Sequence, residues 1–431
     1  MTNLPATGQK RTFAQKVPFF YGWVIVAAMF LAGMASSGPT QWAFQVFVVP
    51  MTEDLGWSRA TMFGAMTARM LLMGVLSIFI GRLADTLKRP QWFMAIGSSL
   101  FALSVVGLAI THSKLLYFVT FSLVGGVGMA MGSGVMRSAF VAKWFVRHRG
   151  MAMTLGTMGT GMGAFIYPVF AQAVIEAFGW RQAWVIMGVS SFLLLVPIAF
   201  FVYRQPEDVG LLPDGDTPQQ MAARRQTATN DATRKDAHSE RNYTVREALN
   251  TRVVWLLVAA AVLAGPSMSG LTSSWAPRFR DVGVAAGAAA AAVSIYGAFS
   301  FFFRFGWGFL SERVHIRKLI IVQMLAISAS IVFLLNVHSA PMAMVYGAVQ
   351  GIFFGGYVGM NPLIYPTYFG RKNIGAIQGV LMPFSTVSSA LGPLTISWVY
   401  DTRGSYNEAY VALAISWVVA AGFMYLARPT K

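Results

Sequence analysis

Long apolar runs alternate with short polar segments along this chain of 431 residues. A helix that crosses a membrane needs about 20 mostly apolar residues, and twelve runs meet that length. They lie at 19–49, 58–81, 91–111, 115–143, 151–177, 182–203, 252–276, 285–310, 317–336, 340–368, 373–400 and 407–427. The pattern therefore predicts an all-α membrane protein with twelve transmembrane helices.

One long polar segment separates the first six runs from the last six. It is rich in Gln, Thr, Arg and Asp, which cannot bury a hydrophobic core, so we expect a flexible linker there. A short amphipathic piece at Val245–Leu249 is expected on the membrane surface. The predicted divisions are an N-terminal tail at 1–18, a six-helix bundle at 19–203, the linker at 204–251, a second six-helix bundle at 252–428 and a C-terminal tail at 429–431.

The composition supports lipid as the solvent of this chain. Charged residues make up 11% of it and hydrophobic residues 56%, whereas a soluble domain has about 25% charged residues. The chain has no cysteine, which excludes disulfides and thiol catalysis. The five histidines are scattered without ligand spacing, and no nucleophile–base pair is visible. We therefore expect no metal, no cofactor and no enzyme activity.

The net charge of +17 does not indicate a nucleic-acid partner, because Lys and Arg form short clusters between the apolar runs. Segments on the side of the termini carry 24 of the 33 Lys and Arg residues, the loops of the other side carry six, and the spans carry three. Basic residues accumulate on the cytoplasmic side of a membrane protein. Residues 1–18 have no small-residue cleavage site, so the first run is expected to be retained. Both termini are predicted to be cytoplasmic, in an inner membrane.

An internal repeat relates the two halves of the chain. The segment GRLADTLKR at 81–89 follows the second run, and GFLSERVHIRK at 308–318 follows the eighth. Both have a Gly at the helix end, an acid four residues later and then a basic cluster. The charged residues expected to form a cytoplasmic gate are Asp85, Arg89, Glu312 and Arg313. Two repeated bundles are a layout in which transporters bind substrate at the bundle interface near the membrane midplane.

These repeats resemble the loop signature of the major facilitator superfamily, roughly G-x-x-x-D-R-x-G-R-K, although the first copy departs from it at Thr86 and Lys88. Other segments resemble the branch of monocarboxylate porters and oxalate–formate exchangers: YGW from Tyr21, WFVRHRGMA from Trp144, and GP from Gly392. The resemblance covers nearly the whole chain except the tail and the linker. It implies transport of a small organic anion by alternating access.

Arg304 is the strongest candidate for a substrate ligand. A charge inside a membrane is costly, so an intramembrane Arg is by default a functional candidate. The resemblance implies that the Arg before the W-G-F-x-S-[DE] run, which begins at Trp307, binds the substrate carboxylate. Guanidinium suits this role because it stays charged and holds a carboxylate with two parallel donors. The alternative is that Arg304 reaches the cytoplasmic headgroups, which is also the expectation for Arg137.

Arg69 stands twelve residues before Gly81, roughly 18 Å from that helix end, too deep to reach the headgroups. It is either a structural residue satisfied by backbone carbonyls and hydroxyls or a second cation for a dicarboxylate. The second role follows from the resemblance, because Leu381 stands where oxalate-type exchangers carry their second cation. A site with Arg304 as its single cation favours a monocarboxylate. A site with both Arg304 and Arg69 favours a dicarboxylate.

Polar and aromatic residues of the first and tenth runs complete the expected site. Gln41 and Gln45 are four residues apart and share a helix face. The resemblance implies that Gln41 and Trp42 face the substrate, as do aromatics of the tenth run, Phe354 and Tyr357. Hydrogen bonding between helices and plain packing are the alternatives. Separately, the glycines spaced for close helix contact are Gly128, Gly132, Gly159 and Gly163.

Neither coupling nor substrate is settled by these patterns. No Asp or Glu lies deep in a predicted span, so exchange, facilitated diffusion and protonation of the substrate all fit, and protons are a candidate partner. An efflux carrier for amphipathic drugs is the first alternative, and it is disfavoured by the intramembrane Arg304 and the lack of a cavity acid. A transporter-like sensor is the second, and it would need a larger cytoplasmic domain than residues 204–251 can form.

Overall fold

The computed structural model describes residues 17–86, 90–132, 140–141, 143–145, 149–216, 243–369 and 374–428. Every regular element within these ranges is a helix. The first half contains α1 (Gly22–Ser37), η2 (Gly38–Ala43), α2 (Phe44–Leu55), α3 (Arg59–Thr86), α4 (Pro90–Gly107), η3 (Leu108–Ile110), α5 (Lys114–Tyr117), η4 (Phe118–Val124), α6 (Gly125–Met131), α8 (Arg149–Thr157) and α9 (Gly159–Phe200). The second half contains α12 (Arg252–Pro266), η8 (Ser267–Leu271), α13 (Thr272–Asp281), α14 (Ala286–Arg313), α15 (Ile316–Leu335), α16 (Ala340–Phe369), α17 (Ile374–Arg403) and α18 (Asn407–Leu426).

The described helices account for the twelve predicted crossings. Nine segments of the described ranges are long and apolar enough to span a membrane. One of them, Met151–Phe200, contains two crossings, because the chain turns back at Gly179, where φ is 81° and glycine is favoured. Helices α3 and α17 supply the remaining two. The prediction of an all-α membrane protein with twelve spans is confirmed.

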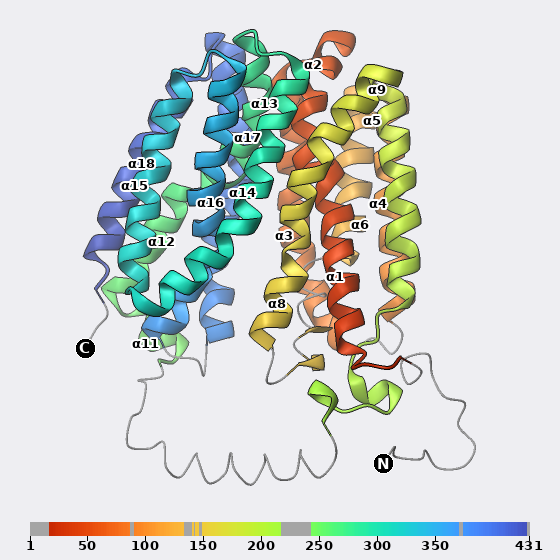
Figure 1. Ribbon diagram of the computed structural model, residues 1–431, viewed down its shortest axis with the longest axis vertical. Coiled ribbons are helices and arrows are strands. Elements are labelled where there is room, and N and C mark those ends of the chain that lie inside the picture. The colour runs from red at the N-terminus through yellow and green to blue at the C-terminus, as the bar shows by residue number, and fades with distance from the viewer. Residues whose placement is uncertain are drawn as a thin grey trace.

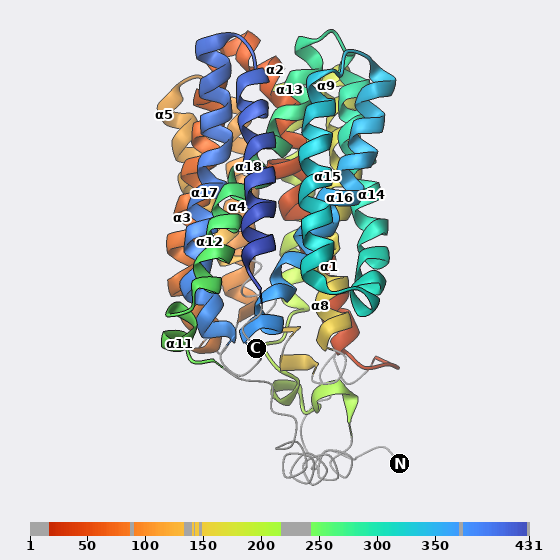
Figure 2. The same cartoon turned by 90° about the vertical axis from the view of Figure 1, so that its left-hand side faces the viewer.

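The two halves of the chain form two bundles, each with its own buried core. Two clusters of buried apolar side chains draw only on residues 21–209, and a third draws only on residues 243–427. Figure 1 shows the bundles side by side, and in Figure 2 the second bundle lies in front of the first; in both views α1 begins and α18 ends at the same end of the molecule. We name that end the terminal end and the other the far end. The two bundles expected from the repeat are thus present.

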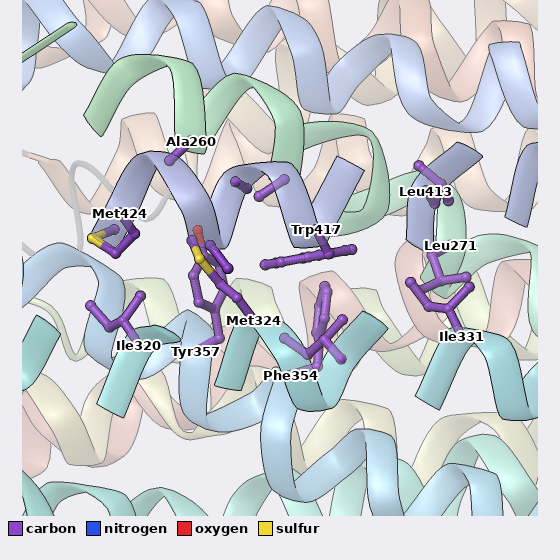
Figure 3. Packing of buried hydrophobic residues seen from close by; sticks show 14 of the residues in the cluster. Ala260, Leu271, Ile320, Met324, Ile331, Phe354, Tyr357, Leu413, Trp417 and Met424 are labelled. Carbon is purple, nitrogen blue, oxygen red and sulfur yellow. The ribbon is translucent and has the colours of Figure 1, made fainter. Parts of the chain in front are cut away.

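Aromatic packing and interhelical hydrogen bonds hold the second bundle together. Trp417 of α18 faces Phe354 and Tyr357 of α16 (Figure 3), with ring centroids 6.2 and 4.9 Å apart. The indole Nε1 of Trp417 donates to the Ser267 hydroxyl at 2.9 Å. Such bonds replace the hydrophobic drive that lipid cannot supply between helices. They tie α16 and α18 to η8.

Glycines allow close helix contacts in the first bundle, as their spacing predicts. A methyl group on Gly159 would overlap the carbonyl oxygen of Phe30 in α1, and one on Gly128 would lie 2.5 Å from the backbone nitrogen of Phe101 in α4. A methyl group on Gly163 would lie 3.1 Å from the carbonyl oxygen of Met34 in α1, a looser contact. A methyl group on Gly132 would have its nearest described neighbour at 3.9 Å, although one on Gly97 of α4 would lie 3.4 Å from the Gly132 nitrogen.

The described ends of the predicted linker are packed, which differs from the flexible chain expected at 204–251. The linker contains η5 (Pro206–Val209), η6 (Pro213–Gly215) and α11 (Val245–Leu249). Val209 is 3% exposed and belongs to a core cluster of the first bundle. Thr244 and Glu247 form a capping box at the start of α11, which explains why a helix forms at this predicted amphipathic piece.

Candidate functional site

The first transmembrane segment changes its helical form at mid-length. Residues Gly38–Ala43 form the π-helical turn η2 between α1 and α2. Pro39 has no backbone N–H to donate, which weakens the α-helical ladder at this point. Gly38 is required by packing as well, because a methyl group there would overlap the ring of Tyr167 in α9. Wide turns of this kind recur at functional sites, and this one carries Gln41 and Trp42.

Trp42 extends from the first bundle into the second. Its ring lies 5.4 Å from that of Tyr296 in α14 and packs against the core cluster of the second bundle. The indole Nε1 is buried and has no hydrogen-bond partner among the described residues. A buried N–H without a partner is costly, so Trp42 offers a free donor at the bundle interface.

Gln45 also joins the two bundles. Its Oε1 accepts a hydrogen bond from the backbone N–H of Ala276 in α13 at 3.3 Å, and its Nε2 donates to the Trp42 carbonyl at 3.3 Å. Gln45 is buried while Gln41 is exposed. The two residues therefore differ in environment although they are four residues apart, since Gln45 packs against α13.

Arg304 lies on α14 in the same bundle as Tyr296. The guanidinium interacts electrostatically with Tyr296, and its Cγ would lie 3.9 Å from a methyl group on Gly359 of α16. Its Nε is buried without a hydrogen-bond partner, and no ion pair joins it to a carboxylate within the described ranges. A half-buried cation with an unused donor has the properties of an anion ligand.

The two predicted aromatics of α16 differ in position. The ring of Phe354 lies 6.5 Å from Tyr296, so it adjoins the group formed by Trp42, Tyr296 and Arg304. Tyr357 is fully buried against Trp417 in the core of the second bundle. The structure thus brings Phe354 to the candidate site and places Tyr357 behind it.

Arg69 lies within the first bundle. Its Nη2 donates to the Thr40 carbonyl at 3.0 Å, and its guanidinium carbon stands 4.1 Å above the ring of Phe121 in η4. These contacts match the structural alternative considered for this residue. Among the described side chains, no hydrogen bond or ring contact joins Arg69 to Arg304.

Of the four residues predicted to form a cytoplasmic gate, only Arg313 has a described side chain. The side chains of Asp85 and Glu312, and all of Arg89, lie outside the described residues. Arg313 is exposed at the end of α14, and its guanidinium lies over the ring of Phe309 at 4.4 Å.

At the far end, an ion pair that the sequence analysis missed joins the bundles. Arg59, at the start of α3, contacts Asp281, the last residue of α13, through two N–O distances of 2.6 Å. Arg59 also donates to the Tyr406 hydroxyl at 2.9 Å, and its backbone N–H faces Asp401 of α17. The sequence did contain a signal for this pair, because Arg59 and Asp281 carry opposite charges at the ends of two spans on the same side of the membrane.

Tyr296 is the second residue that sequence reasoning missed. It stands eight residues before Arg304, at positions i and i+8 of α14, and it connects Trp42 with Phe354. The helical spacing between Tyr296 and Arg304 was a usable signal that both belong to the site. Tyr296 is, however, 3% exposed, so it could equally be interpreted as a core packing residue.

Long apolar helices in two bundles that join through Trp42 and Tyr296 define a polytopic membrane protein. Residues 25–283 and 279–431 match the Major Facilitator Superfamily, and the chain belongs to this family. The family consists of transporters, so the expectation of no enzyme activity is confirmed.

Similar proteins agree with this assignment. The chain is 23% identical to monocarboxylate transporter 12 of Rattus norvegicus over 95% of this chain and 87% of the relative. It is 24% identical to the oxalate:formate antiporter of Oxalobacter formigenes over 100% of this chain and 97% of the relative. The fold is similar to the E. coli xylose transporter, solved in a partially occluded inward-open conformation, with a TM-score of 0.68, 14% identity and coverage of 95% and 100%.

Proposed function

We propose that the protein carries a small monocarboxylate across the inner membrane by alternating access, with both termini in the cytoplasm. The observation that carries this proposal is Arg304, a half-buried guanidinium with an unused Nε that interacts with Tyr296, the residue packed on Trp42 of the first bundle. A carboxylate would supply the acceptors that the described residues do not. The relatives named as a monocarboxylate transporter and an oxalate:formate antiporter support an organic anion.

In this proposal the substrate lies between residues of both bundles. Arg304 anchors the carboxylate from the second bundle, and the free Nε1 of Trp42 donates from the first. Phe354 and Tyr296 bound the apolar part of the substrate. Gln41, which is exposed on η2, adds a polar contact, and Gln45 helps to join the bundles. Asp85, Arg89, Glu312 and Arg313 form the gate of the terminal end.

Uptake into proteoliposomes tests the proposal. The purified protein is assayed with radiolabelled formate, lactate, benzoate and oxalate, with and without a pH gradient. We expect saturable uptake of a monocarboxylate that Arg304→Lys reduces by about tenfold or more, since Lys keeps the charge but loses the paired donors. Near wild-type uptake by both Arg304→Lys and Arg304→Ala would contradict the role of Arg304.

Dicarboxylate exchange is a second candidate because of the buried Arg69. Two of its nitrogens, Nε and Nη1, have no partner among the described residues. Oxalate uptake that exceeds monocarboxylate uptake in the same panel would favour this candidate. Dependence of uptake on an internal anion, rather than on the pH gradient, would identify exchange.

A further inference from the structure

Arg69 is a buried cation in the first bundle whose described contacts include no carboxylate. Its side chain is 3% exposed, and its one hydrogen bond in the described structure goes from Nη2 to the Thr40 carbonyl. A buried charge inside a membrane is costly and is kept for a reason. The contacts that it does make indicate what that reason is.

Two π-helical turns meet at this guanidinium. The accepting carbonyl belongs to Thr40 of η2, and the ring below the guanidinium belongs to Phe121 of η4. A π turn departs from the regular ladder of backbone hydrogen bonds, and a side chain inserted at such a point can satisfy a backbone group and fix the distortion. Arg69 does this for η2, and a cation–π contact attaches it to η4.

The turn that Arg69 holds leads directly to the bundle interface. Trp42, two residues beyond Thr40, packs on Tyr296 of the second bundle. Gln45, three residues further, accepts from the backbone of Ala276. If η2 lost its π-helical form, the contacts of both Trp42 and Gln45 with the second bundle would therefore be displaced.

We propose that Arg69 is a positioning residue that holds η2 in its π-helical form and thereby sets Trp42 against Tyr296. The contacts of its side chain lie inside the first bundle: besides Thr40 and Phe121, its Cγ would be 3.5 Å from a methyl group on Gly126 of α6. The inference rests on the proposed function in so far as Trp42 lines the substrate path.

The absence of cysteine from the chain allows a direct test. Gln41→Cys places a single thiol on the exposed position of η2, one residue from Thr40. The rate of its reaction with N-ethylmaleimide, measured in proteoliposomes without substrate, reports the form of the turn. This readout needs no transported substrate, so its failure is distinguishable from a failure of the proposed function.

Three variants in this background give the expected pattern. Arg69→Met removes the donor and should change the labelling rate by about tenfold, the order that loss of a hydrogen bond from a charged group produces. Arg69→Lys keeps a charged donor of similar reach. Its labelling rate should be close to that of the Gln41→Cys protein that retains Arg69. Ser122→Ala is the matched control, because Ser122 bonds η4 to the Ala65 carbonyl of α3 without touching η2. It should leave the rate unchanged.

The remaining outcomes overturn the proposal. A labelling rate unaffected by Arg69→Met, or changed equally by Arg69→Met and Arg69→Lys, would mean that the hydrogen bond to Thr40 does not set the turn. Arg69→Leu, which also lacks a donor, replaces Arg69→Met if the latter is not recovered as a monodisperse protein. A direct ligand would give another result: oxalate would slow labelling only when Arg69 is present, and Arg69→Met would remove that protection without changing the rate in its absence.

Discussion

Arg59 and Asp281 are 222 residues apart and connect the two bundles at the far end through paired contacts of 2.6 Å. Their side chains are 10% and 23% exposed, so the pair is largely shielded from water. Tyr400 covers the guanidinium carbon at 4.1 Å. In the alternating access proposed above, the bundles separate at each end in turn, which would require this pair to break when the far end opens.

Asp281→Asn should therefore favour opening of the far end. The substitution removes one charge of a paired contact worth about 2 kcal/mol, which corresponds to a population shift of roughly 30-fold. Ala289→Cys provides the readout, because this buried position lines a cavity of ≈ 270 Å³ between the bundles near that end. We expect a membrane-impermeant thiol reagent added from outside to label it faster in the Asp281→Asn background.

Arg403→Gln is the matched control for this experiment. Arg403 pairs with Glu408 at 3.5 Å at the same end, but both residues are exposed and both belong to the second bundle. Exposed pairs contribute little, so the labelling rate should not change. If Arg403→Gln accelerated labelling as much as Asp281→Asn, the effect would reflect a change in surface charge and not the loss of the ion pair between the bundles.

Gly159→Ala should destabilise the protein. Its methyl group would overlap the Phe30 carbonyl, and the two helices would have to move apart, at a cost of about 1–3 kcal/mol. Gly306→Ala is the control, because a methyl group there would meet no atom within 4 Å. Thermal unfolding in detergent should show a lower midpoint for Gly159→Ala alone. Equal midpoints for the two variants would contradict the close contact of α1 with α9.

Trp42→Phe should separate the two roles of this residue. Phe keeps an aromatic ring to pack on Tyr296 but has no Nε1 donor, so the KM of the best monocarboxylate in the uptake panel should rise by roughly tenfold. Trp42→Ala should also lower the maximal rate, since it removes the contact with the second bundle. Trp92→Phe serves as the control because Trp92 is exposed on α4. An unchanged KM in Trp42→Phe would exclude the indole N–H as a substrate ligand.

The sequence predicted those features that depend on local pattern. Span boundaries follow from apolar length, and the close contacts of Gly128 and Gly159 follow from spacing of small residues along a helix. The π-helical form of η2, which carries Gln41, did not follow, because the α-helical period was applied across this turn. Hydrophobicity contains no information on that change of period.

Pairings between distant segments could not be predicted either. The charges of Arg59 and Asp281 were visible at span ends, but their pairing depends on which ends adjoin in three dimensions. Tyr296 was indistinguishable from a core residue until its contact with Trp42 was known. Sequence reasoning therefore named Arg304 and Trp42 as candidates from the two bundles, but it did not identify Tyr296 as the residue that contacts Trp42.

The number of free cations at the interface determines which substrate charge the site can accept. Arg304 retains an unused donor, whereas Leu381 is 4% exposed within the core of the second bundle and supplies no charge. Arg69 has two unpartnered nitrogens, but it donates to Thr40 and lies over Phe121, so its described contacts are within the first bundle. A dianion bound by Arg304 alone would leave its second carboxylate buried and unpaired, at a cost of several kcal/mol.

We therefore expect monocarboxylates to compete better than dicarboxylates of matched length. Acetate and propionate are compared with oxalate and malonate as competitors of a transported monocarboxylate, in the wild type and in Arg69→Gln. The order of competition should favour the monoanions in both proteins, because the described contacts of Arg69 lie within the first bundle. If oxalate competes best in the wild type and loses that advantage in Arg69→Gln, then Arg69 supplies a second cation, the substrate is a dianion, and the monocarboxylate proposal is wrong.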